Sequence, residues 1–381
     1  MRRLVLLTSA IVFVDTMFFA MLTPLLPRYA DEFELSKAGA GVLAAAYPAG
    51  VLVGALPSGW LAGKAGVRRT AVGGLCLVAA TSIVFGFAGS IVLLDLARFV
   101  QGIGSACAWT AALSWLVAVA PPGRRGALIG QTLSVAIVGA LFGPALGGLA
   151  SAAGTRGTFT GIAVLAVCVA AFAAGTNAPS RRAEQPLARL RGALRDRTLL
   201  TGLWLVMLPA LLFGTTTVLV PLRLSELGAG AVAIGAVFVA GAALEATVAP
   251  LSGRLADRKG RYYAISISLA AATVAAAVLP WPSRAPILGV VAVLASASFG
   301  LAWAPAMALL ADAAQRIDLN LAWAFALMNL AWAPGQALGS AAGGAVANAT
   351  SDAVPFLVLS ATCAVTLLVL RRSANAAQQP V

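Results

Sequence analysis

The sequence predicts an all-α membrane protein with twelve transmembrane helices arranged in two six-helix bundles. Three observations lead to this fold class. Of the 381 residues, 60% are hydrophobic and 10% are charged, whereas a soluble domain carries about a quarter charged residues. Twelve apolar runs are long enough to cross a bilayer core of about 30 Å as helices. Two phrases of sequence recur in the second half at nearly the same offset, which indicates a duplicated unit.

The apolar runs divide the chain into two sets of six. The first bundle is predicted over 1–177 and the second over 199–371, with a cytoplasmic linker at 178–198 and a disordered tail at 372–381. The linker is rich in arginine with leucines at helical spacing, which fits either a basic amphipathic helix on the membrane surface or a solvated connection. The expected spans are 4–27, 38–62, 70–89, 90–119, 126–150, 158–177, 199–223, 229–252, 263–281, 285–313, 319–347 and 353–370.

The net charge of +13 is distributed unevenly along the chain. Twenty of the 26 Lys and Arg residues lie at the two termini or in loops that follow even-numbered spans. Cytoplasmic segments of membrane proteins carry such an excess, so both termini are expected in the cytoplasm. No nucleic-acid partner is expected, because the cations do not gather on a soluble domain. Short loops and an alanine-, glycine- and arginine-rich composition suggest a bacterial cytoplasmic (inner) membrane.

Chemistry-bearing side chains are scarce. The chain has no histidine, and its four cysteines all lie within predicted spans. No metal-ligand spacing, no nucleophile with a neighbouring base and no phosphate-binding glycine loop is visible. We therefore expect no metal, no cofactor and no enzymatic activity.

The first repeated phrase follows the second and eighth spans, with Gly59 and Gly253 in equivalent positions 194 residues apart. Glycines permit a tight reversal of the chain here, and Asp257 is placed to meet helix amino-terminal N–H groups. In the first copy, Gly63 stands at the position that corresponds to Asp257. Arg68 and Arg69 of the first loop therefore lack an acidic partner in the sequence. The candidate gating-loop residues are Gly59, Gly66, Arg68, Arg69, Gly253, Asp257, Arg258, Gly260 and Arg261.

The second repeated phrase lies in the fifth and eleventh spans, where Gly139 and Gly335 are 196 residues apart. Its glycines are spaced by four residues and share one helix face, which permits close approach of a neighbouring helix. A proline within the first copy weakens the local hydrogen-bond ladder, and Ser340 replaces it in the second. The residues of the first copy are Gly139, Gly143, Pro144, Gly147 and Gly148.

These phrases resemble motifs of the major facilitator superfamily. The loop phrase is similar to that family's cytoplasmic loop signature, the stretch from Leu94 to Gly104 to its fourth-helix motif with a buried arginine, and the phrase at 139–148 to the motif of its antiporters. The resemblance covers essentially the whole chain and implies the major facilitator fold. It implies a secondary active transporter that exports small amphipathic or cationic molecules by proton antiport with alternating access, as in the twelve-helix drug:proton antiporter branch. The alternative is a narrow-specificity metabolite exporter, for a sugar or an amino acid, or a symporter. The expected partners are a small-molecule substrate, protons and the lipid bilayer, with the protein acting as a monomer.

Three charged residues are predicted inside the membrane: Asp15, Arg98 and Glu245. At a rise of about 1.5 Å per residue, Asp15 and Arg98 lie at similar depths, roughly 16 and 18 Å from the cytoplasmic side. An unpaired charge at that depth is costly, so we expect the two to interact directly or through water and Asp15 to carry the coupled proton. Local pairing of Arg98 with Asp95, or direct contact of Asp15 with cargo, remains open. Glu245 could bind a cationic cargo, share the proton or reach the cytoplasmic interface, and the sequence leaves these choices open.

Aromatic and amide side chains near these charges are candidates for a substrate cavity. Such a cavity suits cationic or amphipathic molecules through desolvation and cation–π contact, although aromatic residues in membrane helices also serve as ordinary packing. The candidates are Phe18, Phe19, Tyr47, Gln101, Trp109, Trp303, Asn329, Trp332 and Gln336.

Overall fold

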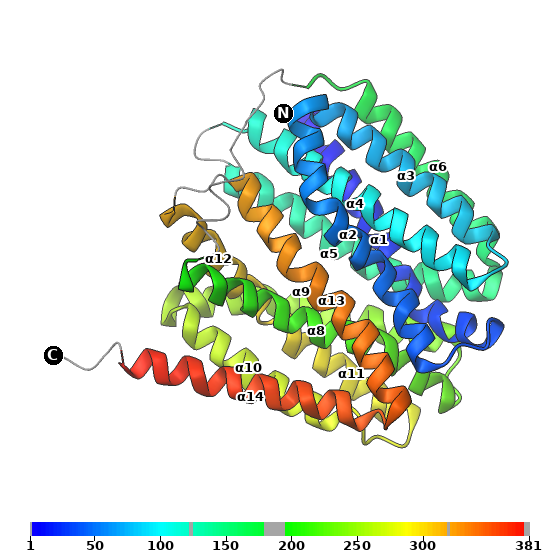
Figure 1. Ribbon diagram of the computed structural model, residues 1–381, viewed down its shortest axis with the longest axis vertical. Coiled ribbons are helices and arrows are strands. Elements are labelled where there is room, and N and C mark those ends of the chain that lie inside the picture. The colour runs from blue at the N-terminus through cyan, green and yellow to red at the C-terminus, as the bar shows by residue number, and fades with distance from the viewer. Residues whose placement is uncertain (1, 122–124, 179–194, 318–320, 377–381) are drawn as a thin grey trace.

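The computed structural model of the chain describes residues 2–121, 125–178, 195–317 and 321–376, and these are almost entirely helical (Figure 1). The helices of the first half are α1 (Arg2–Glu32), α2 (Lys37–Ala65), α3 (Val67–Phe87), α4 (Ile91–Val119), α5 (Arg125–Ala153) and α6 (Thr155–Ala174). Those of the second half are α8 (Arg197–Glu226), α9 (Ala231–Lys259), α10 (Arg261–Val278), α11 (Ala285–Gly300), α12 (Trp303–Arg316), α13 (Leu321–Ala349) and α14 (Ala353–Ala376).

The two halves repeat one packing plan. In the first half α1 packs on α5, α2 on α4, and α3 on α6. The corresponding pairs in the second half are α8 with α13, α9 with α11, and α10 with α14. The halves meet mainly where α2 contacts α13 and where α5 contacts α9. The predicted fold of two six-helix bundles is thus confirmed, and in Figure 1 the blue-to-green bundle lies beside the green-to-red one.

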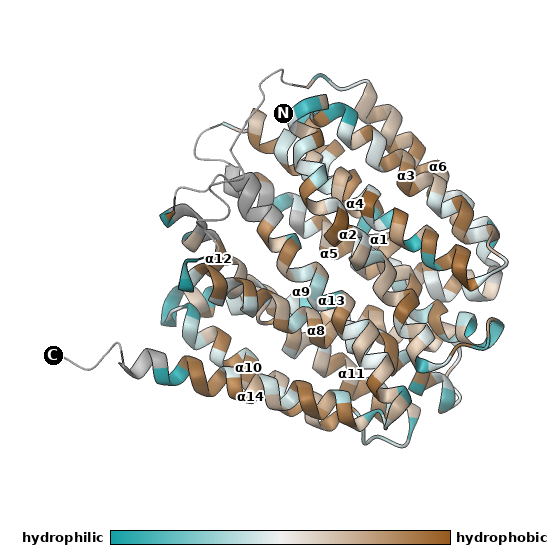
Figure 2. Cartoon of the chain, viewed as in Figure 1, coloured by the Kyte–Doolittle hydropathy of each residue, from teal (hydrophilic) through white to brown (hydrophobic). Residues whose placement is uncertain are grey.

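The helices have the length and composition of membrane spans. Among the described residues, eleven helical stretches are apolar and long enough to cross a bilayer. The remaining expected span, 319–347, is the eleventh and corresponds to α13, which is 29 residues long but includes Asn329 and Gln336. Figure 2 shows hydrophobic residues along the helices, with hydrophilic residues gathered towards helix ends and connections. Large apolar side chains such as Val92 and Val290 point outwards, as expected for a surface that faces lipid.

The tenth span is broken, which the sequence analysis did not predict. It was expected as one helix over 285–313, but α11 ends at Gly300 and α12 begins at Trp303. Pro305 has no N–H, so it leaves the carbonyl of Leu301 without its helical donor. The buried hydroxyl of Ser252 on α9 donates to that carbonyl at 2.6 Å and satisfies it.

Several helix ends differ from the expected bounds, and α9 continues to Lys259 although its span is expected to end at 252. α8 begins at Arg197, just inside the linker expected at 178–198, and most of that linker lies outside the described residues. α14 extends to Ala376, which carries the helix into the tail expected at 372–381. Residues 377–381 of that tail are outside the described part of the chain.

Candidate functional site

Asp15 lies on α1 in the interior of the first half, with only 3% of its surface exposed. Its Oδ2 atom accepts three hydrogen bonds: from the hydroxyl of Tyr47 at 2.9 Å, from the hydroxyl of Ser105 at 2.8 Å and from Nε1 of Trp109 at 2.7 Å. The other oxygen, Oδ1, is buried and has no hydrogen-bond partner among the described residues. Oδ1 is therefore free to take a proton while all three bonds to Oδ2 persist.

Close approach of α2 and α4 places the donors around Asp15. A methyl group at Gly50 on α2 would collide with the carbonyl of Phe99 on α4, and one at Gly102 on α4 would collide with the carbonyl of Tyr47. The two glycines thus allow the helix backbones to touch, which lets side chains from both helices reach the same carboxylate. Ser105 was not among the candidates, although Arg98, Gln101 and Ser105 are spaced by three and four residues on one face of α4. That polar stripe is the signal that would have identified it.

Arg98 is 1% exposed and is held by neutral groups. It donates to Oε1 of Gln101 at 2.9 Å and to the carbonyls of Phe19 at 3.2 Å and Phe18 at 3.5 Å. Its guanidinium carbon also lies 5.0–6.0 Å from the ring centroids of Tyr47, Phe18, Phe19 and Phe85. Ring faces attract a cation, so this aromatic cage stabilises the buried charge without a carboxylate.

Tyr47 lies between the two buried charges. Its hydroxyl contacts Asp15, and its ring is the closest of the four rings to Arg98. Among the described residues no ion pair joins Asp15 and Arg98, so the direct contact considered from the sequence is absent from this structure and Tyr47 bridges the pair. The local alternative is also absent, because Asp95 forms no ion pair with Arg98 and its buried Oδ1 has no partner in the described part of the chain.

Aromatic rings connect this site to the second half. The ring of Phe19 lies 4.9 Å from that of Tyr47 and 5.5 Å from that of Trp332, measured between centroids. Trp332 is on α13, whereas the other two rings belong to α1 and α2. A contact chain therefore runs from the Asp15 carboxylate through Tyr47 and Phe19 to the opposite bundle.

The remaining cavity candidates are spread over other environments. Phe18 is 1% exposed and packs on Phe85 and Phe159 within the core of the first half. Trp303 stacks on Phe213 at 6.3 Å in the second half. On α13, Asn329 is partly buried, and the buried Gln336 donates from Nε2 to Thr217 at 3.5 Å.

Glu245 lies apart from this network, on α9. It is partly buried and makes no side-chain hydrogen bond or ion pair within the described residues. Its carboxyl group occupies the space beside Gly300. A methyl group added at Gly300 would lie 2.5 Å from Cδ of Glu245. The structure therefore places the third predicted membrane charge at the break between α11 and α12 rather than beside Asp15.

The glycine phrase of α5 packs against the segment of α1 that carries Asp15. A methyl group at Gly139 would lie 2.7 Å from the carbonyl of Phe13, and one at Gly143 would lie 2.6 Å from the carbonyl of Met17. Gly147 faces Pro24 in the same way. A second face of α5 packs on α9 of the second half. Gly148 lies against the backbone of Ala231, and the carbonyl of Pro144 lies against Gly235.

Only Gly66 and Gly260 of the two loop phrases form the turns between consecutive helices, and the other candidate residues of these phrases lie within the flanking helices rather than in loops. Gly66 separates α2 from α3 with φ +88°, and Gly260 separates α9 from α10 with φ +91°, a conformation that favours glycine. In the second half Arg261 forms an ion pair with Asp312 and donates to the carbonyl of Ala308 at 3.0 Å. The other gating-loop side chains that were predicted, Arg68, Arg69, Asp257 and Arg258, are exposed and make no ion pair with described residues. Gly59 and Gly253 lie within α2 and α9, and a methyl group added at either would meet no atom within 4 Å.

Among the described residues there is no group of three His, Cys, Asp or Glu that could hold a metal ion. A cavity of about 320 Å³ between α8 and α13 is lined almost wholly by apolar side chains, including Trp204, Met207 and Leu330.

Comparisons with known proteins address the fold and the family. A family model described as "Major Facilitator Superfamily" matches residues 8–335. The chain is 32% identical over 142 residues to "MFS-type transporter ppzB" of Metarhizium rileyi (strain RCEF 4871) and 32% identical over 143 residues to the protein of that name in Metarhizium majus (strain ARSEF 297). Each match covers 36% of this chain and only 29% and 31%, respectively, of the lengths of those relatives.

Solved structures of the same architecture align over nearly the whole chain. A partially occluded inward-open conformation of the xylose transporter XylE from E. coli superposes with a TM-score of 0.77 and 14% sequence identity, covering 97% of this chain and 98% of that one. A crystal structure of a D-xylose–proton symporter gives a TM-score of 0.76 at 14% identity, covering 97% and 96%. At this identity the likeness shows the fold alone.

Proposed function

The chain belongs to the Major Facilitator Superfamily, and we propose that it exports small amphipathic or cationic molecules in exchange for protons. The observation that carries this proposal is the Asp15 carboxyl group. It is buried, it accepts three hydrogen bonds on one oxygen, and its other oxygen has no partner among the described residues. A carboxyl group held in this way can gain or lose a proton without losing its position.

The coupling step follows from charge. Protonation of Asp15 at Oδ1 neutralises the carboxylate, and deprotonation restores a negative charge in a site of low polarity. A cationic cargo balances that charge as well as a proton does, so the two ligands exclude each other. The proton gradient drives the exchange: the pH difference acts on every proton carried, and the membrane potential adds about 2.3 kcal/mol per 100 mV for each net charge that crosses.

The surroundings of Asp15 support an amphipathic or cationic cargo. Phe19, Trp109 and Trp332 offer ring faces, and such faces attract cations and cover apolar surface. Arg98 is already enclosed by four rings and three acceptors, which supports a role in shaping the site rather than in holding an anionic cargo.

The proposed site of action is a cytoplasmic membrane, with both termini in the cytoplasm and the protein working as a monomer. The positive charge of the terminal and even-to-odd segments supports this orientation. We infer a bacterial membrane from the alanine-, glycine- and arginine-rich composition.

A second candidate function is transport of a polar metabolite such as a sugar or an amino acid, by export or by symport. The amide side chains of Asn329 and Gln336 on α13 favour it, because amides hydrogen-bond to hydroxyl groups. These residues are few and one of them is already bonded to Thr217, so we rank this candidate second.

The test is accumulation of a fluorescent lipophilic cation in cells that lack their own efflux pumps. Cells with the wild-type protein should accumulate less dye than cells with an empty vector, and an uncoupler should abolish the difference. Asp15→Asn should accumulate as much dye as the empty vector, because the amide cannot exchange a proton. Asp95→Asn is the matched control and should export normally. If the inserted wild-type protein leaves dye levels unchanged, exchange of labelled sugars and amino acids in proteoliposomes tests the second candidate.

A further inference from the structure

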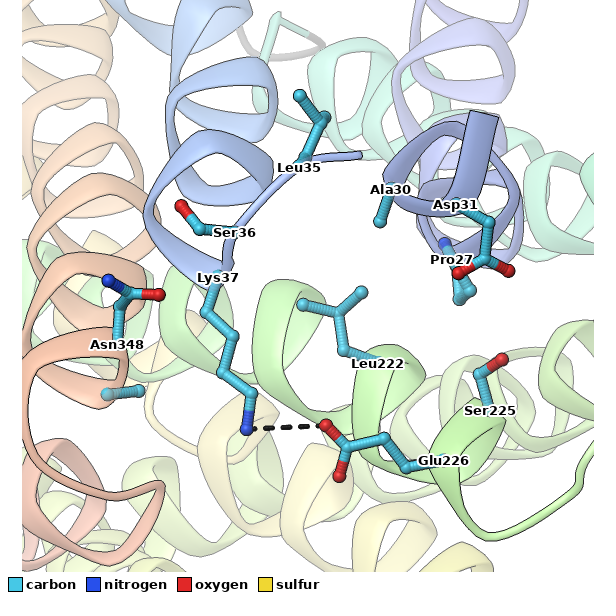
Figure 3. Close-up of a pocket in the computed structure, with 11 residues that line it drawn as sticks. Pro27, Ala30, Asp31, Leu35, Ser36, Lys37, Leu222, Ser225, Glu226 and Asn348 are labelled. Atoms are coloured by element: carbon cyan, nitrogen blue, oxygen red, sulfur yellow. Dashed lines mark ion pairs between the residues drawn. The ribbon is translucent and has the colours of Figure 1, made fainter. Parts of the chain in front are cut away.

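Lys37 joins the two halves at the end of the molecule where α1 is followed by α2. It is the first residue of α2, and its Nζ lies 2.7 Å from Oδ1 of Asp352 and 3.4 Å from Oε1 of Glu226. Both acids belong to the second half, Glu226 at the end of α8 and Asp352 just before α14. Within the described residues, these are the ion pairs that connect one bundle to the other. Figure 3 shows the Lys37 side chain pointing at Glu226.

The backbones of the two halves touch at the same place. A methyl group at Gly344 on α13 would collide with the carbonyl of Lys37, and one at Gly41 would lie 2.5 Å from the carbonyl of Ser340. Gly344 is the last glycine of the second repeated phrase. The glycines at 335, 339 and 343 pack α13 on α8, and Gly344, on an adjacent face, packs it on α2. The ion pairs of Lys37 thus lie where glycines allow the backbones of α2 and α13 to approach closely.

Neighbouring residues hold Glu226 and the start of α2 in position. Arg223 donates to Oε2 of Glu226 at 2.9 Å, one turn earlier on α8, which leaves Oε1 directed at Lys37. Ser36 caps α2 by accepting a hydrogen bond from the N–H of Gly39 at 3.2 Å, and this fixes where the helix carrying Lys37 begins.

Water reaches this contact, because a cavity of about 680 Å³ opens beside it (Figure 3). Side chains of both halves line it, among them Asp31 and Leu35 from the first and Ser225 and Asn348 from the second. The Lys37 side chain is 27% exposed and that of Glu226 is 43% exposed. Partly hydrated ion pairs are weak, so these can break and form again without a large barrier.

We propose that Lys37 is a latch that holds this end closed by binding Glu226 and Asp352, and that it must release both acids for the two halves to separate here. The latch rests on the proposed alternating-access function, in which this end faces away from the cytoplasm. Loss of the lysine charge should shift the conformational equilibrium towards the form open at this end by about fivefold, the effect of a modest ion-pair network.

A matched control lies at the same end of the molecule. Arg28 and Glu32 form an ion pair at 3.8 Å within α1, and Arg28 also donates to the carbonyl of Ser151 on α5 at 3.3 Å. All of these residues belong to the first half. Removing the Arg28 charge therefore changes the electrostatics of this end without cutting a link between halves.

The experiment measures the distance across the latch. Spin labels are attached to cysteines at Glu34 and Ser351, two exposed positions in different halves, after the native cysteines are replaced by alanine. Electron–electron distance distributions are recorded for the protein in lipid nanodiscs at fixed pH. Lys37→Gln should raise the ratio of the long-distance to the short-distance population about fivefold, whereas Arg28→Gln should match the parent. The charge swap Lys37→Asp with Asp352→Lys should return the distribution towards the parent.

The proposal is overturned if Lys37→Gln leaves the distribution unchanged, or if Arg28→Gln shifts it equally. Failure of the charge swap to restore the short distance, with the protein folded by gel filtration, contradicts the electrostatic explanation. The distances are measured without any cargo, so a negative dye-export result would reject the proposed cargo class without affecting this outcome.

Discussion

The hydroxyl of Tyr47 donates to Oδ2 of Asp15 at 2.9 Å, and the same oxygen of Tyr47 lies 2.7 Å from the hydroxyl of Ser105. Tyr47 is 3% exposed, so its contribution to the site is a hydrogen bond made inside the bundle rather than a surface offered to cargo. Its ring also faces Arg98 and Phe19. A change in the charge of Asp15 therefore alters a hydrogen bond of Tyr47. Tyr47 is also the residue of α2 whose ring contacts Phe19, which in turn contacts Trp332 of the second half.

Tyr47→Phe should reduce proton-coupled transport by about tenfold while the protein stays folded. The substitution keeps the ring against Phe19 but removes one of the three hydrogen bonds to Asp15, a loss of about 1–3 kcal/mol for a charged acceptor. Initial rates of dye export in proteoliposomes with an imposed proton gradient measure the effect. Tyr263→Phe, an exposed tyrosine on α10, is the control and should transport at the parental rate. A fully active Tyr47→Phe would show that the ring alone matters.

The sequence allowed the membrane fold to be predicted because apolar runs and the repeat are one-dimensional signals. It also identified Asp15 and Arg98, since charged side chains are rare in membrane helices, and it gave Tyr47 as an aromatic candidate for the cavity. It did not identify the bridge between them. Counting residues gives depth along a helix, but which face meets a neighbour depends on packing, here on the glycine contact of α2 with α4.

The break between α11 and α12 illustrates a second limit. Prolines also occur inside α1, α2, α8 and α9, and all of these remain continuous helices. Pro305 alone therefore does not predict a break. What distinguishes this position is tertiary: Ser252 satisfies the freed carbonyl of Leu301, and Gly300 leaves room for Glu245. Neither contact is visible from local sequence.

Arg98→Lys should abolish most transport even though it preserves the charge. The guanidinium donates to three acceptors on two helices and lies among four rings, and a single ammonium group cannot reproduce that planar arrangement. We expect at least about a tenfold loss in export rate and a lower melting temperature. Arg28→Lys, at a partly exposed ion pair, should change neither quantity. Normal export by Arg98→Lys would mean that only the charge at this position is required.

Gly143→Val should prevent stable folding of the first half. A side chain there meets the carbonyl of Met17 and the Cβ of Ala20 at 2.6 Å, so α1 and α5 must move apart and Asp15 must move with α1. Overpacking of this kind costs about 1–3 kcal/mol or more. Gly130→Ala on the same helix, where no atom lies within 4 Å, is the control. Yield of monodisperse protein and its melting temperature report the difference, and equal values for both variants would contradict the packing argument.

Ser252→Ala should lower the stability of the second half without touching the Asp15 site. The substitution removes the donor to the carbonyl of Leu301, and a buried carbonyl left without a partner costs about 1–3 kcal/mol. A decrease of a few degrees in melting temperature is expected. Ser266→Ala, whose exposed hydroxyl bonds only within its own helix, should melt like the parent. Because Pro305 creates the need for this donor, Pro305→Ala combined with Ser252→Ala should recover most of the lost stability. If the double variant is no more stable than Ser252→Ala, the hydroxyl stabilises the break by some other contact.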